Sequence, residues 1–201
     1  AWGLNIYGQT NVPAPNADFI GIAAGLYHSL GLKTDGSIVA WGAGGPGQSG
    51  DPHYGQSIDP VPNSDFIAIS AGGFHSLGLK SDNSIVAWGL NTSGQCDIPL
   101  PNADFIAISA GQYHSMARKS DGSIVSWGNN ANQKLDLPDP NTLLIAVAAG
   151  GEYSLGLKPG SRFLGEGSCT PVNPCTSIAL TGACCDEGNC TQETAFDCAE
   201  K

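Results

Sequence analysis

One ten-residue segment occurs four times in the chain, and its recurrence limits the folds that the chain can adopt. It occupies Ala24–Lys33 and returns, with substitutions, at 71–80, 110–119 and 149–158. A Trp-Gly pair follows each of the first three copies, and an isolated pair stands near the start; the tryptophans are Trp2, Trp41, Trp88 and Trp127. A period of roughly 40 residues is typical of repeat architectures, in which one supersecondary unit stacks against its copies.

Each unit is predicted to contain three short β-strands. In the first unit these strands are 19–23, 28–33 and 37–41, because apolar and β-branched residues dominate them and Asp35-Gly36 is a strong hairpin signal. Paired prolines in the connectors stop strand pairing between units. Strands this short bury a face only by stacking, so Ile20 and Ile22 and their equivalents are expected to pack between units.

The repeats are expected to end before the C-terminus. Units are assigned to about 10–42, 57–89, 96–128 and 135–167, and a cysteine-rich, truncated module to 168–201. In the fourth unit Tyr153 stands at the histidine position and Glu166 at the tryptophan position. A charged residue at a buried tryptophan position indicates that this edge no longer packs as the others do.

Cysteines are concentrated in the C-terminal module. Only Cys96 lies among the repeats, whereas six others share the last part of the chain: Cys169, Cys175, Cys184, Cys185, Cys190 and Cys198. This density favours a disulfide-stapled module in an oxidising compartment, so we expect a secreted or cell-surface protein. A zinc site is the alternative, but the paired C-x2-C spacing of thiolate zinc sites is absent from the sequence.

The charge excludes two classes of partner. The net charge is −10, and the lysines and arginines form no basic stripe of the kind that binds nucleic acid. The same acidity opposes docking on anionic lipid, and no apolar run reaches the roughly 18 residues of a membrane span. We therefore expect neither nucleic-acid binding nor membrane insertion.

The repeat closely resembles the regulator-of-chromosome-condensation repeat. The resemblance rests on Ala-Gly-x-Tyr/Phe-His-Ser-Leu-x-Leu-Lys-x-Asp-Gly-x-Ile-Val-x-Trp-Gly followed by Asn-x-x-Gly-Gln, and covers residues 1 to about 167. It implies an all-β fold, a β-propeller of seven four-stranded blades, similar in style to secreted bacterial propellers such as the one that inhibits β-lactamases. The C-terminal module resembles small cysteine-rich repeats of extracellular bacterial proteins.

The number of units departs from this family. About four units are present, so the chain is expected to form a partial propeller with open blade edges and apolar end faces. Such edges are a liability that proteins cover. A protein partner or self-association across the open edges is therefore predicted.

Three histidines share one repeat position, which favours a structural role. We expect each of His28, His75 and His114 to make one hydrogen bond inside its own unit, since architecture repeats whereas catalysis needs different groups that meet once. A shared metal held by the three imidazoles is the alternative. Structural roles are also assigned to Trp41, Trp88 and Trp127 and to Gly25, Gly72 and Gly111. No cofactor is predicted.

The residues that break the repeat are the candidate binding residues. An insertion at 43–54 lengthens the connector after Trp41 and contains Asp51, His53 and Tyr54. Insertions in repeat folds form loops on one face, which is often the binding face. The sequence therefore favours a secreted, non-enzymatic module that binds protein or glycan through its loops. A hydrolase with a shallow site of His, Asp and Ser residues and a structural subunit of an extracellular assembly are the alternatives.

Overall fold

The computed structural model describes residues 1–159 and the backbone of two short strands, β12 (Ala183–Asp186) and β13 (Asn189–Gln192). Residues 1–159 form one compact unit, and 160–201 belong to a second. β12 and β13 pair antiparallel, with Cys185 opposite Cys190. The predicted boundary at residue 167 lies outside the described residues. So do the side chains of the predicted disulfide cysteines, Cys169, Cys175, Cys184, Cys185, Cys190 and Cys198.

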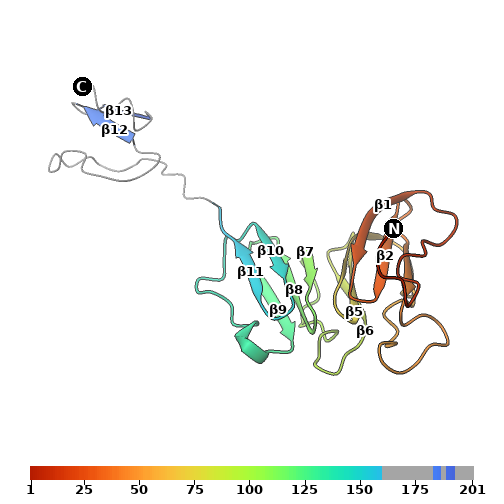
Figure 1. Ribbon diagram of the computed structural model, residues 1–201. Coiled ribbons are helices and arrows are strands. Elements are labelled where there is room, and N and C mark those ends of the chain that lie inside the picture. The colour runs from red at the N-terminus through yellow and green to blue at the C-terminus, as the bar shows by residue number, and fades with distance from the viewer. Residues whose placement is uncertain (160–182, 187–188, 193–201) are drawn as a thin grey trace. The chain divides into compact units, whose positions relative to one another are not determined.

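Each repeat forms its own antiparallel sheet, as Figure 1 shows, so the prediction of an all-β repeat fold is confirmed. The first three sheets have three strands each: β1 (Phe19–Ala24), β2 (His28–Lys33), β3 (Ile38–Gly42), β4 (Phe66–Ala71), β5 (His75–Lys80), β6 (Ile85–Gly89), β7 (Phe105–Ala110), β8 (His114–Lys119) and β9 (Ile124–Gly128). In the fourth repeat the described strands are β10 (Ala146–Ala149) and β11 (Ser154–Leu157), and a short 3-10 helix, η1 (Ala131–Gln133), precedes them.

An asparagine from the connector occupies the position where a fourth strand would pair. The amide of Asn63 bonds both ways with Ile38 on the outer strand β3: Nδ2 donates to the carbonyl at 2.7 Å, and Oδ1 accepts from the N–H at 2.7 Å. Asn102 and Asn141 repeat this pair on Ile85 and Ile124. The side chain satisfies the backbone of the edge strand, so in the described sheets three strands suffice where the resemblance implied four.

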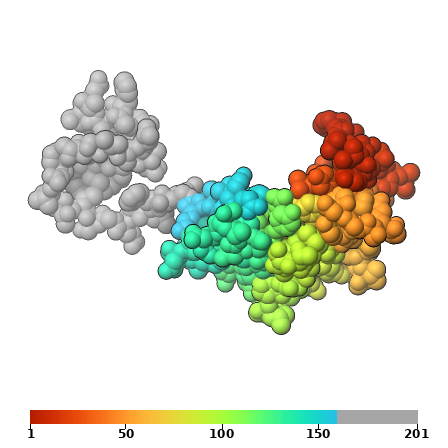
Figure 2. Space-filling model, turned by 60° about the horizontal axis from the view of Figure 1, so that its bottom comes forward, coloured from red at the N-terminus to blue at the C-terminus, as the bar shows by residue number. Residues whose placement is uncertain are grey.

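Consecutive units pack face to face, in chain order (Figure 2). The face of the first unit offers Leu30, Leu32 and Ile38, and these side chains contact Phe66 and Trp88 of the second. The second and third units pack in the same way. Phe105 and Trp127 of the third unit contact the face of the second unit. The core is thus a series of inter-unit layers, which explains why a single short sheet can be stable only within the array.

The prediction that both isoleucines of each repeat pack between units is wrong for the first member of the pair. Ile69 packs in the inter-unit layer, but Ile20, Ile67 and Ile106 are exposed. A β-bulge follows the first residue of β1, β4 and β7, and these isoleucines lie at it. The extra residue shifts the alternation by one, so the preceding phenylalanine takes the core position instead.

Apolar side chains are uncovered at both ends of residues 1–159. At the first unit, Trp2 is 93% exposed and Ile22 is 83% exposed. At the fourth, Leu155 and Leu157 are exposed. Within residues 1–159, these two faces therefore expose apolar side chains of the kind that the inner faces bury.

Candidate functional site

A hydrogen-bonded relay crosses every interface between consecutive units. Ser76 Oγ donates to the Gln56 carbonyl at 3.0 Å, and its lone pair faces His28 Nε2 of the preceding unit at 2.9 Å. The relay recurs at the next interfaces, where His75 faces Ser115 at 2.9 Å and His114 faces Ser154 at 3.0 Å. Since each serine gives its only proton to a carbonyl, the imidazole Nε2 must be the donor.

Burial keeps these imidazoles neutral. It lowers the pKa of His28 to about 4 and that of His75 to about 3, and His75 also feels the neighbouring histidines. The pKa of His114 is lowered too, first by burial and then by the Lys134 charge. The Nδ1 atoms are buried and have no hydrogen-bond partner among the described residues, so a second ring proton would be unsatisfied.

The histidines hold neighbouring units together rather than a turn inside their own unit. The prediction of a hydrogen bond inside each unit is therefore wrong, because the acceptor lies in the next unit, 40 to 48 residues further along the chain. Each imidazole is directed at a different serine, and within the described residues no cluster of three metal-ligating side chains occurs. A shared metal site does not follow from this arrangement.

The repeated tryptophans and glycines surround the same relay. Trp41, Trp88 and Trp127 donate Nε1–H to the carbonyls of Gln9, Gln56 and Gln95, at 2.9, 3.1 and 2.9 Å, and these carbonyls also accept from the serines. A Cβ on Gly25, Gly72 or Gly111 would overlap the adjacent imidazole and the backbone carbonyl of the next unit's glycine. Glycine is thus required there by the close approach of two units.

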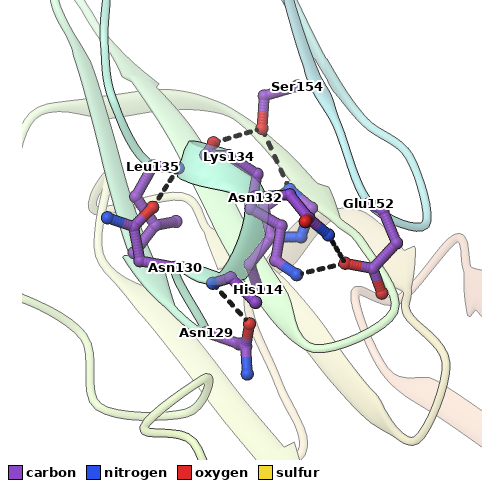
Figure 3. A network of polar contacts seen from close by, with 9 residues as sticks. His114, Asn129, Asn130, Asn132, Lys134, Leu135, Glu152 and Ser154 are labelled. Carbon is purple, nitrogen blue, oxygen red and sulfur yellow. Dashed lines mark hydrogen bonds and ion pairs between the residues drawn. The ribbon is translucent and has the colours of Figure 1, made fainter.

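The fourth unit modifies the relay, as Figure 3 shows. Lys134 stands at the glutamine position, and its carbonyl accepts from Ser154 at 2.8 Å. Its buried Nζ pairs with Glu152 at 2.6 Å, and this hydrogen bond is the main cause of the lowered pKa of the carboxyl group. Asn132 also donates to Glu152. The substitutions at 134 and 152 are thus coupled, because a lone ammonium at the buried position would be costly.

Within residues 1–159, the repeated His, Ser and Asp residues do not assemble a hydrolytic site. Ser76 and Ser115 are fully buried and donate to backbone carbonyls, so neither hydroxyl is activated by its histidine nor open to a substrate. The repeated carboxylates Asp65 and Asp104 precede the inner strands, at the end of each sheet opposite the histidines. Their left-handed backbone, with φ of 67° and 65°, explains why aspartate suits these positions.

A row of aromatic rings crosses the units beside the relay. The residue before each histidine is aromatic, and the rings of Tyr27, Phe74 and Tyr113 follow one another with centroids 5.9 and 5.6 Å apart. Tyr7 extends the row, since its ring lies 5.2 Å from Tyr27. These four residues, with His53 and Tyr54, are called the aromatic row below.

The insertion joins this row. His53 packs edge-on against Tyr7 at 5.5 Å, and its Nδ1 accepts from the Gly44 N–H at 2.9 Å. Tyr54 packs edge-on against Phe74 at 5.7 Å, and its hydroxyl donates to Asp51 at 3.1 Å. Burial and the Asp51 carboxylate raise the pKa of this tyrosine. The structure therefore brings the three candidate residues of the insertion to a surface formed mainly by repeat residues.

Sequence reasoning missed three sets of residues that shape this region. The sequence pattern contains two of these sets but assigns them no role: the glutamines whose carbonyls accept from Trp and Ser (Gln9, Gln56 and Gln95) and the aromatic residues before the histidines. The third set is the edge-pairing asparagines Asn63, Asn102 and Asn141. Each set recurs at a fixed repeat position, so an alignment of the units could have revealed it. The partners of the asparagines and of the histidines lie in a neighbouring unit, which such an alignment cannot show.

Comparison with known proteins supports the fold. The family description "Regulator of chromosome condensation (RCC1) repeat" matches residues 19–48, 66–95 and 105–133. These three segments are similar to RCC1 repeats. These three matches begin at β1, β4 and β7, so the repeats of the family coincide with the sheets, and residues 1–159 form part of an RCC1-like β-propeller.

Similar solved structures are longer chains. The chain resembles yeast RCC1 (Prp20) bound to Kap60, with 24% identity and a TM-score of 0.56, over 70% of this chain and 41% of that one. It resembles the ectodomain of receptor kinase CR4 from Physcomitrella patens, with 24% identity and a TM-score of 0.64, over 79% and 43%. The chain thus spans about two fifths of each. No curated protein sequence gives a significant match.

In the described part of the chain, no helix is long and apolar enough to cross a membrane.

Proposed function

We propose that residues 1–159 act as a non-enzymatic protein-binding module, and that the tyrosines of the aromatic row form the contact surface, while the buried Phe74 connects their rings. The single observation that carries this proposal is the continuity of the row over several units, with rings 5.2 to 5.9 Å apart. Aromatic residues dominate the energetic centres of protein interfaces, because they bury large area at little conformational cost. In yeast, an RCC1 propeller chain was solved together with a protein, Kap60, which accords with this role.

A protein partner fits the row better than a glycan. Several of its rings pack edge-on against a neighbour, so they present edges and partial faces rather than a flat stacking platform. The half-exposed tyrosines combine apolar rings with hydroxyl groups, as the cores of protein interfaces do. No cofactor is needed for this function.

The binding proposal predicts a localised loss of affinity. Immobilised protein would capture its partner from extracellular extract, and the affinity of the purified pair would then be measured by calorimetry. Y27A and Y113A should each weaken binding by roughly tenfold or more, as interface hot spots do. V61S is the control, since Val61 is 95% exposed on a connector outside the row. Equal affinity of Y27A, Y113A and the wild type would contradict the proposal, as would capture of a polysaccharide instead of a protein.

We further propose that the protein is secreted and that its C-terminal module is held by disulfides. The sequence has seven cysteines, of which only Cys96 lies in the repeats. Cys96 is half-buried and forms no disulfide with any described residue, and burial raises its thiol pKa to about 12. Burial thus disfavours the thiolate, which is the reactive form of cysteine.

Thiol titration tests the disulfides directly. In denaturant without reductant, about one thiol per chain should react if the six clustered cysteines are paired. After reduction all seven should react. Reaction of all seven in denaturant and chelator without reductant would favour the zinc alternative and count against secretion.

A further inference from the structure

The end of the sheets that lies opposite the histidines exposes one isoleucine from every unit. This end, called the turn end below, holds the hairpin turns at 34–37, 81–84 and 120–123 and the first residues of the inner strands, since Phe66 donates its N–H to the Gly36 carbonyl at 3.0 Å. The inner strands β1, β4, β7 and β10 contact one another in chain order, so the isoleucines follow one another across the units. They are Ile20, Ile67, Ile106 and Ile145, each between 41% and 63% exposed.

A β-bulge directs these isoleucines outward in the first three units. The register shifts between Phe19 and Gly21, and the same shift occurs in β4 and β7. Bulges re-aim side chains and are common beside functional sites. The phenylalanines that precede the isoleucines, such as the buried Phe66 and Phe105, already fill the core. Packing within residues 1–159 therefore does not account for apolar side chains at this exposed position.

Leu143 adds a further apolar side chain to the turn end in an unfavourable backbone conformation. Its φ is 61°, and it is 71% exposed. The other units have Asp18, Asp65 and Asp104 at this position, also with a left-handed backbone. Aspartate tolerates that conformation, whereas leucine is disfavoured in it, and burial does not offset the strain here. Residues strained in this way are concentrated at functional sites, so Leu143 points to a contact that its side chain makes with a ligand.

Carboxylates outnumber lysines around these apolar side chains. Each of the first three units exposes two aspartates, one before the inner strand and one in the hairpin turn. Hydrogen bonds from the serines two residues further along lower the pKa of the turn aspartates, so these stay ionised at neutral pH. The six aspartates are Asp18, Asp35, Asp65, Asp82, Asp104 and Asp121, and the lysines are Lys33, Lys80, Lys119 and Lys158.

The lysines of the first three units are engaged with their own sheets. Lys33, Lys80 and Lys119 place Nζ between 5.0 and 5.2 Å from the centroid of a phenylalanine ring in the same unit. Within the described residues, the aspartates do not gather into a group of three metal-ligating side chains. A partner with several separated positive charges therefore matches this surface better than a single metal ion.

We propose that the turn end binds a cationic, amphipathic polypeptide segment. Its apolar side chains would lie on the isoleucines and Leu143, and its lysines or arginines would face the aspartates, since complementary charge selects partners and speeds their association. The net charge of −10 opposes a second copy of this chain, anionic lipid and nucleic acid alike. Tyr27 and Tyr113 lie at the other end of the sheets, next to the histidines, so this second surface does not rest on the aromatic row.

Two labelled synthetic peptides test the proposal with the full chain. The first carries leucine on one helix face and lysine on the other, and in the second serine replaces every leucine. Fluorescence anisotropy should show that the leucine peptide binds about tenfold more tightly or better, and that added salt weakens its binding. Equal affinities would mean that charge alone attracts the peptides and would overturn the proposal. Failure of the leucine peptide to bind would overturn it as well.

Paired variants locate the contact on the protein. I67S/I106S should weaken binding of the leucine peptide by about tenfold, and D82N/D121N should weaken it and reduce its salt dependence. I58S and D136N are the matched controls, since Ile58 is exposed in a connector and Asp136 accepts a hydrogen bond from Asn130 away from the turn end. Both should stay within about twofold of the wild type. A control variant that weakens binding as much as I67S/I106S does would place the peptide elsewhere and refute the assignment.

L143N separates a binding role from a structural one. Asparagine suits the left-handed backbone, so this variant should raise the urea midpoint, and it should weaken binding of the leucine peptide because an apolar contact is lost. A lowered midpoint would show that Leu143 serves the fold. Unchanged affinity would show that Leu143 does not meet the peptide. Either result would contradict the proposal.

Discussion

Replacing Phe105 with alanine should destabilise the protein by about 3–5 kcal/mol, the range typical of a buried phenylalanine in a rigid core. The Phe105 side chain is fully buried between the second and third units, against Leu77, Leu79 and Trp127. Lys119 Nζ lies 5.2 Å from the ring centroid and covers its outer edge. The neighbouring strands are fixed by inter-unit hydrogen bonds, so the cavity cannot collapse fully. Urea unfolding followed by circular dichroism would give the change in free energy.

The equivalent residue of the first unit provides a matched control. Phe19 also lies under a lysine, with Lys33 Nζ 5.2 Å from its ring centroid, but one side of the ring borders the open hollow. We expect F19A to cost only about 1–2 kcal/mol, because less apolar area leaves contact with protein. If F19A were as costly as F105A, the Phe19 ring would have to be packed against protein on both sides in solution. That result would contradict the hollow beside the ring.

The strands and their order follow from the sequence because their signals are local. Alternating apolar runs such as 28–33 and turns such as Asp35-Gly36 involve neighbours a few residues apart, and the sheet order β1-β2-β3 matches the expected meander. The bulge after Phe19 is different. It is one extra residue on one strand, and no turn or glycine pattern marks it, so Ile20 could not be distinguished from Ile22 by alternation alone.

The polar contacts between units could not be derived from a single repeat. Ser29 and Ser76 occupy equivalent positions, so the sequence does not show whether His28 bonds to one or to the other. The answer depends on how closely two sheets approach, which Gly25 and Gly72 allow. The same limit applies to Asn63, whose partner Ile38 belongs to the preceding unit. Sequence periodicity identified the positions that matter, and only the stacking shows what they contact.

Mild acid should unfold the protein, because its buried histidines must become charged. The pKa of an unfolded histidine is near 6.5, whereas the folded values are about 4 for His28 and about 3 for His75. The unfolded chain therefore binds more protons below pH 6.5, and stability is present above that pH and lost as the pH falls toward the folded values. Each histidine lowers the free energy of unfolding by about 1.4 kcal/mol per pH unit. The two together therefore lower it by roughly 5 kcal/mol between pH 6.5 and 4.5. This loss is comparable with the whole stability of many domains.

One carboxylate opposes this effect: burial raises the pKa of Asp59, so the folded state takes up this proton more readily than the unfolded chain as the pH falls. Other carboxylates lie outside the window. The pKa values of Asp35, Asp82 and Asp121 are lowered by hydrogen bonds from Ser37, Ser84 and Ser123, so these groups titrate below the chosen pH window. Urea unfolding at pH 6.5, 5.5 and 4.5 would therefore report mainly on the imidazoles.

Two variants separate the histidines from other titrating groups. H75Q keeps an N–H that can reach Ser115 but has no proton to gain, so the loss of stability between pH 6.5 and 4.5 should fall by roughly half. H53Q is the control, because His53 lies in the insertion outside the relay and its ring packs against Tyr7 at the surface. H75Q should lose a larger part of the pH dependence than H53Q does. An unchanged slope in H75Q would mean that burial does not keep the His75 imidazole neutral, and would contradict the donor role assigned to its Nε2.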